Sequence, residues 1–179
     1  MPTPLCLLAR KHGSDKFSAK HSYTQFYYDT FKDRRESVLK VVELGVGEGA
    51  SLRMWREFFP NAHILGGDND ATRLLRDERI TVMPCDQASR TDLMMFANWI
   101  GPNVDLFIDD GSHKPLDQHF TCRTLMPQLD PGVVYVIEDV VEDEIGIADT
   151  YEGYPASVPA LPHRRRYDNH LIVVRHAAN

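Results

Sequence analysis

Short apolar runs of strand length recur through the middle of the chain. They cover residues 38–44, 62–66, 80–83, 104–108 and 133–137, and turn-forming residues bound each of them. Between these runs, apolar residues recur at helical spacing. Near-continuous apolar strands that alternate with helices are typical of a parallel sheet covered on both faces. The pattern therefore predicts an α/β fold, with a Rossmann-like, doubly wound, mostly parallel sheet of six to seven strands.

Two segments flank this predicted sheet. Residues 1–36 are expected to form an N-terminal helical cover, because aromatic residues in 22–34 fall on one face of a helix that Ser22 would cap. Residues 140–168 are acidic and then rich in proline, and only 171–174 again has the pattern of a strand. Loops of that length in a compact domain are usually functional or mobile. We interpret 140–168 as a lid over an acceptor substrate.

Composition narrows the classes of function. Of the 179 residues, 42% are hydrophobic and 26% are charged, and no apolar run approaches the ~20 residues that a membrane span needs. The first residues lack the pattern of a secretory signal, so we expect a cytoplasmic protein without a membrane partner. The net charge of −6 argues against nucleic acid as a partner. The basic run Arg164–Arg166 is interpreted as a solvated surface or as a clamp for an anionic acceptor.

A glycine-rich turn after the first strand is the strongest local signal. Ligands of open α/β sheets bind at the carboxyl ends of the strands, where this turn lies. The spacing of Gly45, Gly47 and Ala50 also fits a dinucleotide site, so an NAD-dependent oxidoreductase is an alternative. Glu43 and Glu48 would repel a pyrophosphate but tolerate the sulfonium and ammonium groups of S-adenosylmethionine (SAM). The turn therefore favours SAM.

Acidic residues at the ends of the next two strands complete the expected cofactor site. Asp68 lies about twenty residues beyond the glycines, where an acid binds the ribose hydroxyls, although it could instead cap the next helix. Asp86 and Gln87 end the third strand on the expected adenine side. The predicted cofactor-binding residues are Glu43, Gly45, Gly47, Gly49, Ser51, Asp68, Asn69, Asp86, Gln87, Asp109 and Tyr23.

Carboxylates also follow the fourth and fifth strands. Asp110 follows one of them, and Glu138 with Asp139 follows the other. Neighbouring strands lie ~4.8 Å apart, so these carboxylates can converge, and a divalent cation would relieve their repulsion. We predict that Asp110, Glu138 and Asp139 bind Mg²⁺ or another divalent cation. We also predict that Asp110 and His113 are catalytic, His113 as general base for an acceptor hydroxyl, although His113 alone could merely start a helix.

Taken together, these motifs resemble class I SAM-dependent O-methyltransferases of the macrocin and mycinamicin sugar type, which are related to cephalosporin hydroxylase-like proteins. Residues 13–16 and 21–24 are similar to the leading segment of that family, and 109–113 with 137–139 to its metal and base motifs. The resemblance implies that residues 1–179 form a single SAM-dependent methyltransferase domain.

The resemblance also implies a reaction. It indicates metal-assisted transfer of a methyl group from SAM to a hydroxyl of a small-molecule acceptor, such as a glycoside of natural product biosynthesis. The other expected partner is a further copy of the chain in a homo-oligomer. A non-catalytic SAM-binding module is a second alternative. The metal and base motifs argue against it, because a pure binding module has no need of them.

Overall fold

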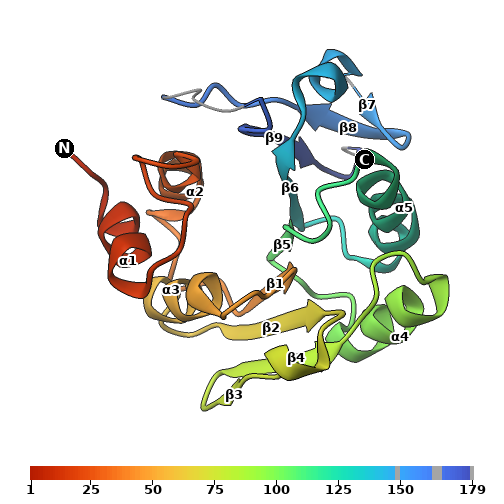
Figure 1. Ribbon diagram of the computed structural model, residues 1–179, viewed down its shortest axis with the longest axis horizontal. Helices are drawn as coiled ribbons and strands as arrows, with labels where there is room; N and C mark the ends of the chain where they lie inside the picture. Colours follow the sequence, from red (N-terminus) through yellow and green to blue (C-terminus); the bar gives the residue numbers. More distant parts are fainter. Residues whose placement is uncertain (148–149, 163–166, 178–179) are drawn as a thin grey trace.

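A nine-stranded sheet forms the centre of the computed structural model, which describes residues 1–147, 150–162 and 167–177 (Figure 1). The strands in spatial order are β3 (Arg76–Asp77), β4 (Ile80–Pro84), β2 (His63–Asp68), β1 (Lys40–Leu44), β5 (Leu106–Asp109), β6 (Val134–Val140), β9 (His170–Val174), β8 (Tyr154–Ser157) and β7 (Thr150–Tyr151). The run from β4 to β6 is parallel, whereas β3, β9, β8 and β7 pair antiparallel to their neighbours.

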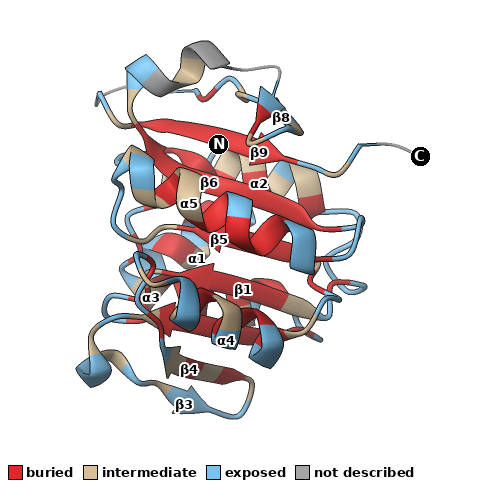
Figure 2. Ribbon diagram, turned by 90° about the vertical axis from the view of Figure 1, so that its right-hand side faces the viewer, coloured by how far each residue is buried: buried red, intermediate tan, exposed pale blue. Residues whose placement is uncertain are grey.

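Helices cover both faces of the sheet. On one face lie α1 (Pro4–His12), α2 (Tyr23–Phe31) and α3 (Ala50–Phe58), and on the other lie α4 (Arg90–Ile100) and α5 (Pro115–Leu125) (Figure 1). The short 3₁₀ helices are η1 (Ala71–Arg73), η2 (Met126–Gln128) and η3 (Glu142–Ile147). The strands β1, β5, β6 and β9 are largely buried, whereas β3 is exposed, and α4 and α5 expose their outer sides (Figure 2). In the part of the chain that the structure describes, no helix is long and apolar enough to cross a membrane.

Strand alternation decides which side chains meet the N-terminal cover. Val41 of β1 packs in the core under α1–α3, whereas Val42 packs in the core under α4 and α5. In β6, Val136 packs in the core under α1–α3 and Ile137 packs in the core under α4 and α5. Because side chains alternate with a period of two, Glu43 points toward the cover. The same alternation places charged residues from three strands on the cover side.

The N-terminal cover contains two helices, α1 and α2, and both pack against the α3 side of the molecule. Ser22 precedes α2, as predicted, but it does not cap the helix with its side chain. Its backbone has a φ of 64°, and its hydroxyl donates to the carbonyl of Ser18 at 3.0 Å. The helix is therefore held by the burial of its aromatic face, which includes Tyr27 and Phe31.

The segment 140–168, interpreted as a loop, is partly strand. Residues 150–157 form the antiparallel pair β7 and β8, and β8 extends the sheet through Ala156 opposite Val174. Two of the nine strands, β3 and β7, are only two residues long, which explains why the sequence pattern predicts six to seven. Arg164–Arg166 lie outside the described residues.

Candidate active site

Two cavities share a wall at the carboxyl ends of the parallel strands. The large cavity has a volume of about 610 Å³ and lies between the glycine turn and the segment 13–20. The small cavity has a volume of about 200 Å³ and lies toward Asp86. Residues that line both are Gly45, Asp68, Asn69 and Gly111. The large cavity alone is in the size range of small-molecule sites.

The glycine turn is shaped by close approach of two backbones. Gly45 has a φ of +88°, and a methyl group there would lie 1.9 Å from the carbonyl oxygen of Asp110. Only glycine fits this position. Asp68 then fixes the turn, because its Oδ2 accepts hydrogen bonds from the backbone N–H groups of Val46 at 2.8 Å and Gly47 at 3.2 Å.

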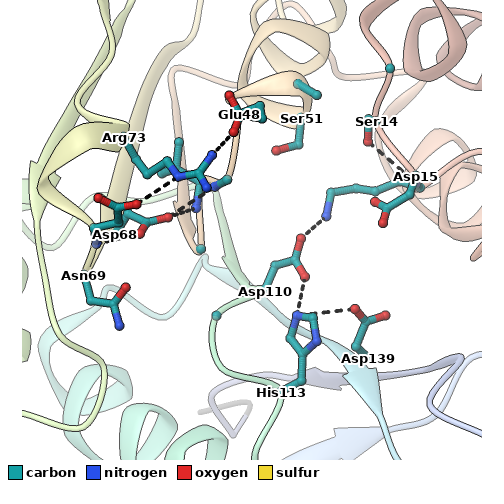
Figure 3. A pocket seen from close by; sticks show the side chains of 18 of the residues that line it. Ser14, Asp15, Glu48, Ser51, Asp68, Asn69, Arg73, Asp110, His113 and Asp139 are labelled. Carbon is teal, nitrogen blue, oxygen red and sulfur yellow. Dashed lines mark hydrogen bonds and ion pairs between the residues drawn. The ribbon is translucent and has the colours of Figure 1, made fainter.

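At the other end of the large cavity, Asp110, His113 and Asp139 converge (Figure 3). One donor atom from each lies within 4.8 Å of the others. The Nε2 atom of His113 is 3.2 Å from Asp110 Oδ1 and 3.4 Å from Asp139 Oδ2. These three residues, called the donor group below, have the oxygen and nitrogen atoms that a divalent cation binds.

Two members of the donor group have strained backbones. The φ angles of His113 and Asp139 are 58° and 52°, in the left-handed region that residues other than glycine rarely adopt. Such conformations cost on the order of 1–3 kcal/mol each and persist where surrounding contacts hold them. In β6 the pairing with β9 shifts register between Ile137 and Val140, and this irregularity turns Asp139 toward the cavity.

Lys16 carries a buried ammonium group into the carboxylates. Its side chain is 2% exposed, and Nζ lies 2.5 Å from Asp110 Oδ2 and 3.3 Å from Glu43 Oε1, and also bonds Glu138. Burial alone would lower the pKa of Lys16, but the three carboxylates hold it well above its ordinary value. The ammonium therefore stays charged and neutralises part of the cluster.

The structure does not bring Glu138, a predicted metal ligand, into the donor group. Its side chain is 1% exposed and faces the cover, where Lys16 bonds one carboxylate oxygen and the hydroxyl of Tyr27 donates to the other at 2.5 Å. The physical reason is strand alternation. Glu138 keeps the direction of Val136, whereas Asp139 follows the irregularity in β6.

Asp139 is supported from behind by the cover. The Tyr23 hydroxyl donates to Asp139 Oδ1 at 2.7 Å and accepts from the Asp139 backbone N–H at 3.2 Å. His21 Nδ1 lies 3.0 Å from the same carboxylate. Burial would raise the pKa of Asp139, but His21 and Tyr23 lower it below its ordinary value. Tyr23, predicted to bind the cofactor, thus lies behind Asp139 and lines neither cavity.

The other predicted cofactor residues divide into two sets. Those that line a cavity are Gly45, Gly47, Ser51, Asp68, Asn69, Asp86 and Gln87. Glu43, Gly49 and Asp109 line neither cavity. Glu43 is fully buried and accepts a hydrogen bond from Trp55 Nε1 at 2.8 Å, and Gly49 precedes α3 with a φ of 73°. Burial raises the pKa of Asp109 to about 7, and Gln87 donates to its carboxylate.

His113 is protonated at neutral pH in this arrangement. Its hydrogen bond to Asp110, followed by the charge of Asp139, raises its pKa from 6.5 to about 9. His113 can therefore act as the predicted general base near neutral pH only when another positive charge balances Asp110 and Asp139 and so lowers the pKa of the imidazole.

Lys16, His21 and Tyr27 are absent from the site predicted by sequence alone. Lys16 and His21 lie in the two segments that the family resemblance singles out, but their contacts depend on where the cover packs. Tyr27 belongs to the apolar face predicted for its helix, and the apolar pattern does not indicate that its hydroxyl bonds Glu138.

Sequence comparison finds O-methyltransferases. The chain is 39% identical over 140 residues to 8-demethyl-8-alpha-L-rhamnosyl tetracenomycin-C 2'-O-methyltransferase of Streptomyces olivaceus. It is 36% identical over 140 residues to mycinamicin VI 2''-O-methyltransferase of Micromonospora griseorubida. These matches cover 74% of this chain but only 36% and 35% of the two enzymes, so the chain spans about a third of their length. No protein-family model matches the chain.

Structure comparison gives the same relationship. The MycE methyltransferase from the mycinamycin biosynthetic pathway, in complex with Mg and SAH, is 35% identical with a TM-score of 0.70, over 78% of this chain and 40% of that one. A second crystal form is 26% identical with a TM-score of 0.74, over 98% and 54%. The predicted class I methyltransferase fold is therefore confirmed.

Replacing Lys16 by methionine should destabilise the protein strongly. Glu43, Asp110 and Glu138 would lose the cation they share, and burial, which already raises the pKa of Glu43 and Glu138, would no longer be opposed by its charge. Losing one partner of a buried ion pair costs about 3–5 kcal/mol. Urea unfolding at pH 7 measures the change. Lys20→Met is the matched control, because Lys20 lines the same cavity but is exposed. Equal unfolding free energies for both variants would contradict this role of Lys16.

The pKa of His113 can be measured by NMR titration of the imidazole in protein freed of metal by a chelator. We expect a value near 9 in the wild type and a lower value, toward 6.5, in Asp110→Asn, which removes the charged hydrogen-bond partner. Asp105→Asn is the control, because Asp105 precedes β5 at the opposite end of the strand. A wild-type pKa of 6.5 would show that Asp110 and Asp139 do not act on His113.

Proposed function

Because this chain belongs to the macrocin- and mycinamicin-type sugar O-methyltransferase family, we propose that it transfers the methyl group of SAM to a hydroxyl of a small-molecule acceptor. The observation that carries the proposal is the convergence of Asp110, His113 and Asp139 at one end of a cavity whose other end is the glycine turn and Asp68. We propose a sugar of a natural product as acceptor, as in the relatives' names.

The two cavities fit SAM. The base would enter the small cavity beside Asp86 and Gln87, and Asp68 at the shared wall would accept hydrogen bonds from the ribose hydroxyls. The large cavity then holds the amino acid part near Ser51 and Ser14. When bound, SAM supplies an electrophilic methyl group on a sulfonium. The carboxylates around this cavity favour that positive charge.

The donor group fits one divalent cation. Two carboxylates and an imidazole within 4.8 Å of one another leave room for Mg²⁺ or Mn²⁺, which prefer oxygen ligands. We propose Asp110 and Asp139 as its holders, with Glu138 retained on Lys16. Such a cation supplies Lewis acidity, which lowers the pKa of an acceptor hydroxyl.

His113 would act as the base for that hydroxyl. Its imidazole is partly exposed at the cavity and lies against both carboxylates of the donor group. Once the charge of Asp110 and Asp139 is balanced, the imidazole loses the main cause of its raised pKa and can accept the hydroxyl proton. Asp68 and Ser51, which would hold SAM, line the same cavity as His113, so SAM would supply its methyl group in the cavity where the acceptor hydroxyl would be held.

The two alternative functions fit less well. An NAD-dependent enzyme would set a pyrophosphate on the N–H groups of the glycine turn, but Asp68 already accepts from Val46 and Gly47. A non-catalytic SAM-binding module has no use for strained backbone at both His113 and Asp139. The cytoplasmic location and a homo-oligomer remain predictions.

Isothermal titration of the purified protein tests the proposal. We expect S-adenosylhomocysteine, the product of SAM, to bind and NAD⁺ not to bind. Asp68→Ala should weaken S-adenosylhomocysteine about tenfold or more, because it removes a charged hydrogen-bond acceptor and the anchor of the glycine turn. Asp139→Asn should weaken Mn²⁺ and leave S-adenosylhomocysteine nearly unchanged.

Asp33→Ala, at an exposed position of the cover, is the control for both titrations. Binding of NAD⁺ in place of S-adenosylhomocysteine would overturn the proposal. So would affinities for S-adenosylhomocysteine and Mn²⁺ that are the same in Asp68→Ala, Asp139→Asn and Asp33→Ala.

A further inference from the structure

Gln87 lies between the small cavity and the loop that carries Asp110 and His113. We call residues 109–113 the Asp110 loop. The side-chain Nε2 of Gln87 donates to Asp109 Oδ1 at 2.6 Å, and its Oε1 accepts from the Ser112 backbone N–H at 2.8 Å. The two ends of one amide therefore hold the loop on both sides of Asp110.

The Gln87 amide also packs closely against the backbone of the Asp110 loop. At Gly111, a methyl group would lie 2.3 Å from Gln87 Oε1 and 3.0 Å from its amide carbon. Glycine at this position lets the Gln87 amide lie directly against the loop backbone. Gln87 is 7% exposed, so few other positions are open to its side chain. Shape and hydrogen bonds both fix the amide against the loop.

The Asp110 loop depends on such contacts. His113, at its end, has a φ of 58°, a conformation that costs free energy and relaxes when the surrounding contacts are lost. Asp109, at its start, is fully buried, and its carboxylate needs hydrogen-bond donors there. Loss of the Gln87 amide would remove a donor from Asp109 and an acceptor from Ser112.

We propose that Gln87 is a positioning residue that couples occupation of the small cavity to the geometry of Asp110 and His113. Gln87 lines that cavity, so a planar base inside it contacts the amide that already holds the loop. A glutamine side chain loses rotamer freedom when it is packed, and a base that restrains Gln87 restrains the loop with it. The identity of that base, the adenine of SAM, rests on the proposed function.

This role differs from simple recognition of the base. One amide N–H and one lone pair of Gln87 are already used by Asp109 and Ser112. A residue that only bound the base would act on affinity alone. A residue that also positions the loop makes binding at the small cavity and order at the Asp110 loop depend on each other, and this dependence is reciprocal.

Hydrogen exchange of the backbone amides in residues 109–114, followed by NMR, tests the coupling. The probe is adenosine, which has the base and ribose but lacks the amino acid part and cannot reach the donor group. In the wild type, saturating adenosine should slow exchange at Ser112 and His113 at least about fivefold. In Gln87→Met, of similar length but unable to form these hydrogen bonds, exchange should be faster without ligand and unchanged by adenosine.

Three further variants separate the contributions. Gln87→Glu keeps an acceptor for Ser112 but loses the donor to Asp109, so its exchange should lie between those of the wild type and Gln87→Met. In Gly111→Ala, the added methyl group would push the Gln87 amide away from the loop, so its exchange should match that of Gln87→Met. Asn69→Ala is the matched control, because Asn69 lines the same cavity. It should weaken adenosine, yet show the wild-type slowing once saturated.

Exchange in Gln87→Met that equals the wild type, with and without saturating adenosine, would overturn the proposal. A wild type that binds neither adenosine nor S-adenosylhomocysteine would instead overturn the proposed function. In that case the free proteins still decide whether Gln87 holds the loop, because faster exchange in Gln87→Met needs no ligand.

Discussion

The buried ammonium group of Lys16 is the interaction on which the rest of the site depends. Strands β1, β5 and β6 bring Glu43, Asp110 and Glu138 to one place on the cover side of the sheet, where three negative charges would repel one another. A charge in the interior is stable only when it is paired and hydrogen-bonded. Lys16 comes from the segment between α1 and α2, so charge balance ties the N-terminal cover to the sheet.

This pairing also divides the carboxylates by role. Glu43 and Glu138 are fully buried and both pair with Lys16. Trp55 also donates a hydrogen bond to Glu43, and Tyr27 donates one to Glu138. Asp110, in contrast, contacts Lys16 and also lines the cavity. Asp139 reaches the cavity through the irregularity in β6 and a left-handed backbone, and Tyr23 of the cover supports it from behind. The site thus combines a buried group of acids around Lys16 with Asp110 and Asp139, which line the cavity.

The sequence predicted the features that follow from periodicity. Apolar runs separated by helical patterns suffice for the doubly wound sheet, and turn residues after each strand locate Asp68, Asp110 and Asp139 at one rim. Features that depend on packing were not predictable in this way. Periodicity does not reveal that the cover places Lys16 among acids. It also does not reveal the irregularity in β6, so Glu138 and Asp139 looked equivalent.

The same limit applies to the margins of the fold. The pair β7 and β8 has too few residues for a periodic signal, and proline in the same region favoured a loop interpretation. Strand alternation could have shown that Glu43, Asp110 and Glu138 share a face, because their neighbours Val41, Ile108 and Val136 lie in one core. The predicted ligand set grouped Glu138 with Asp139 because both follow the fifth predicted strand and because residues 137–139 resemble the metal motif of the family.

We propose that Asp110, which Lys16 also bonds, and Asp139 form a cation site at the His113 end of the cavity. Anomalous diffraction from crystals grown with Mn²⁺ and S-adenosylhomocysteine tests it most directly. We predict one manganese peak in contact with the carboxylates of Asp110 and Asp139, with Lys16 still bonded to Glu138 and Glu43. No peak at these carboxylates, or Lys16 displaced from its three acids, would contradict the account.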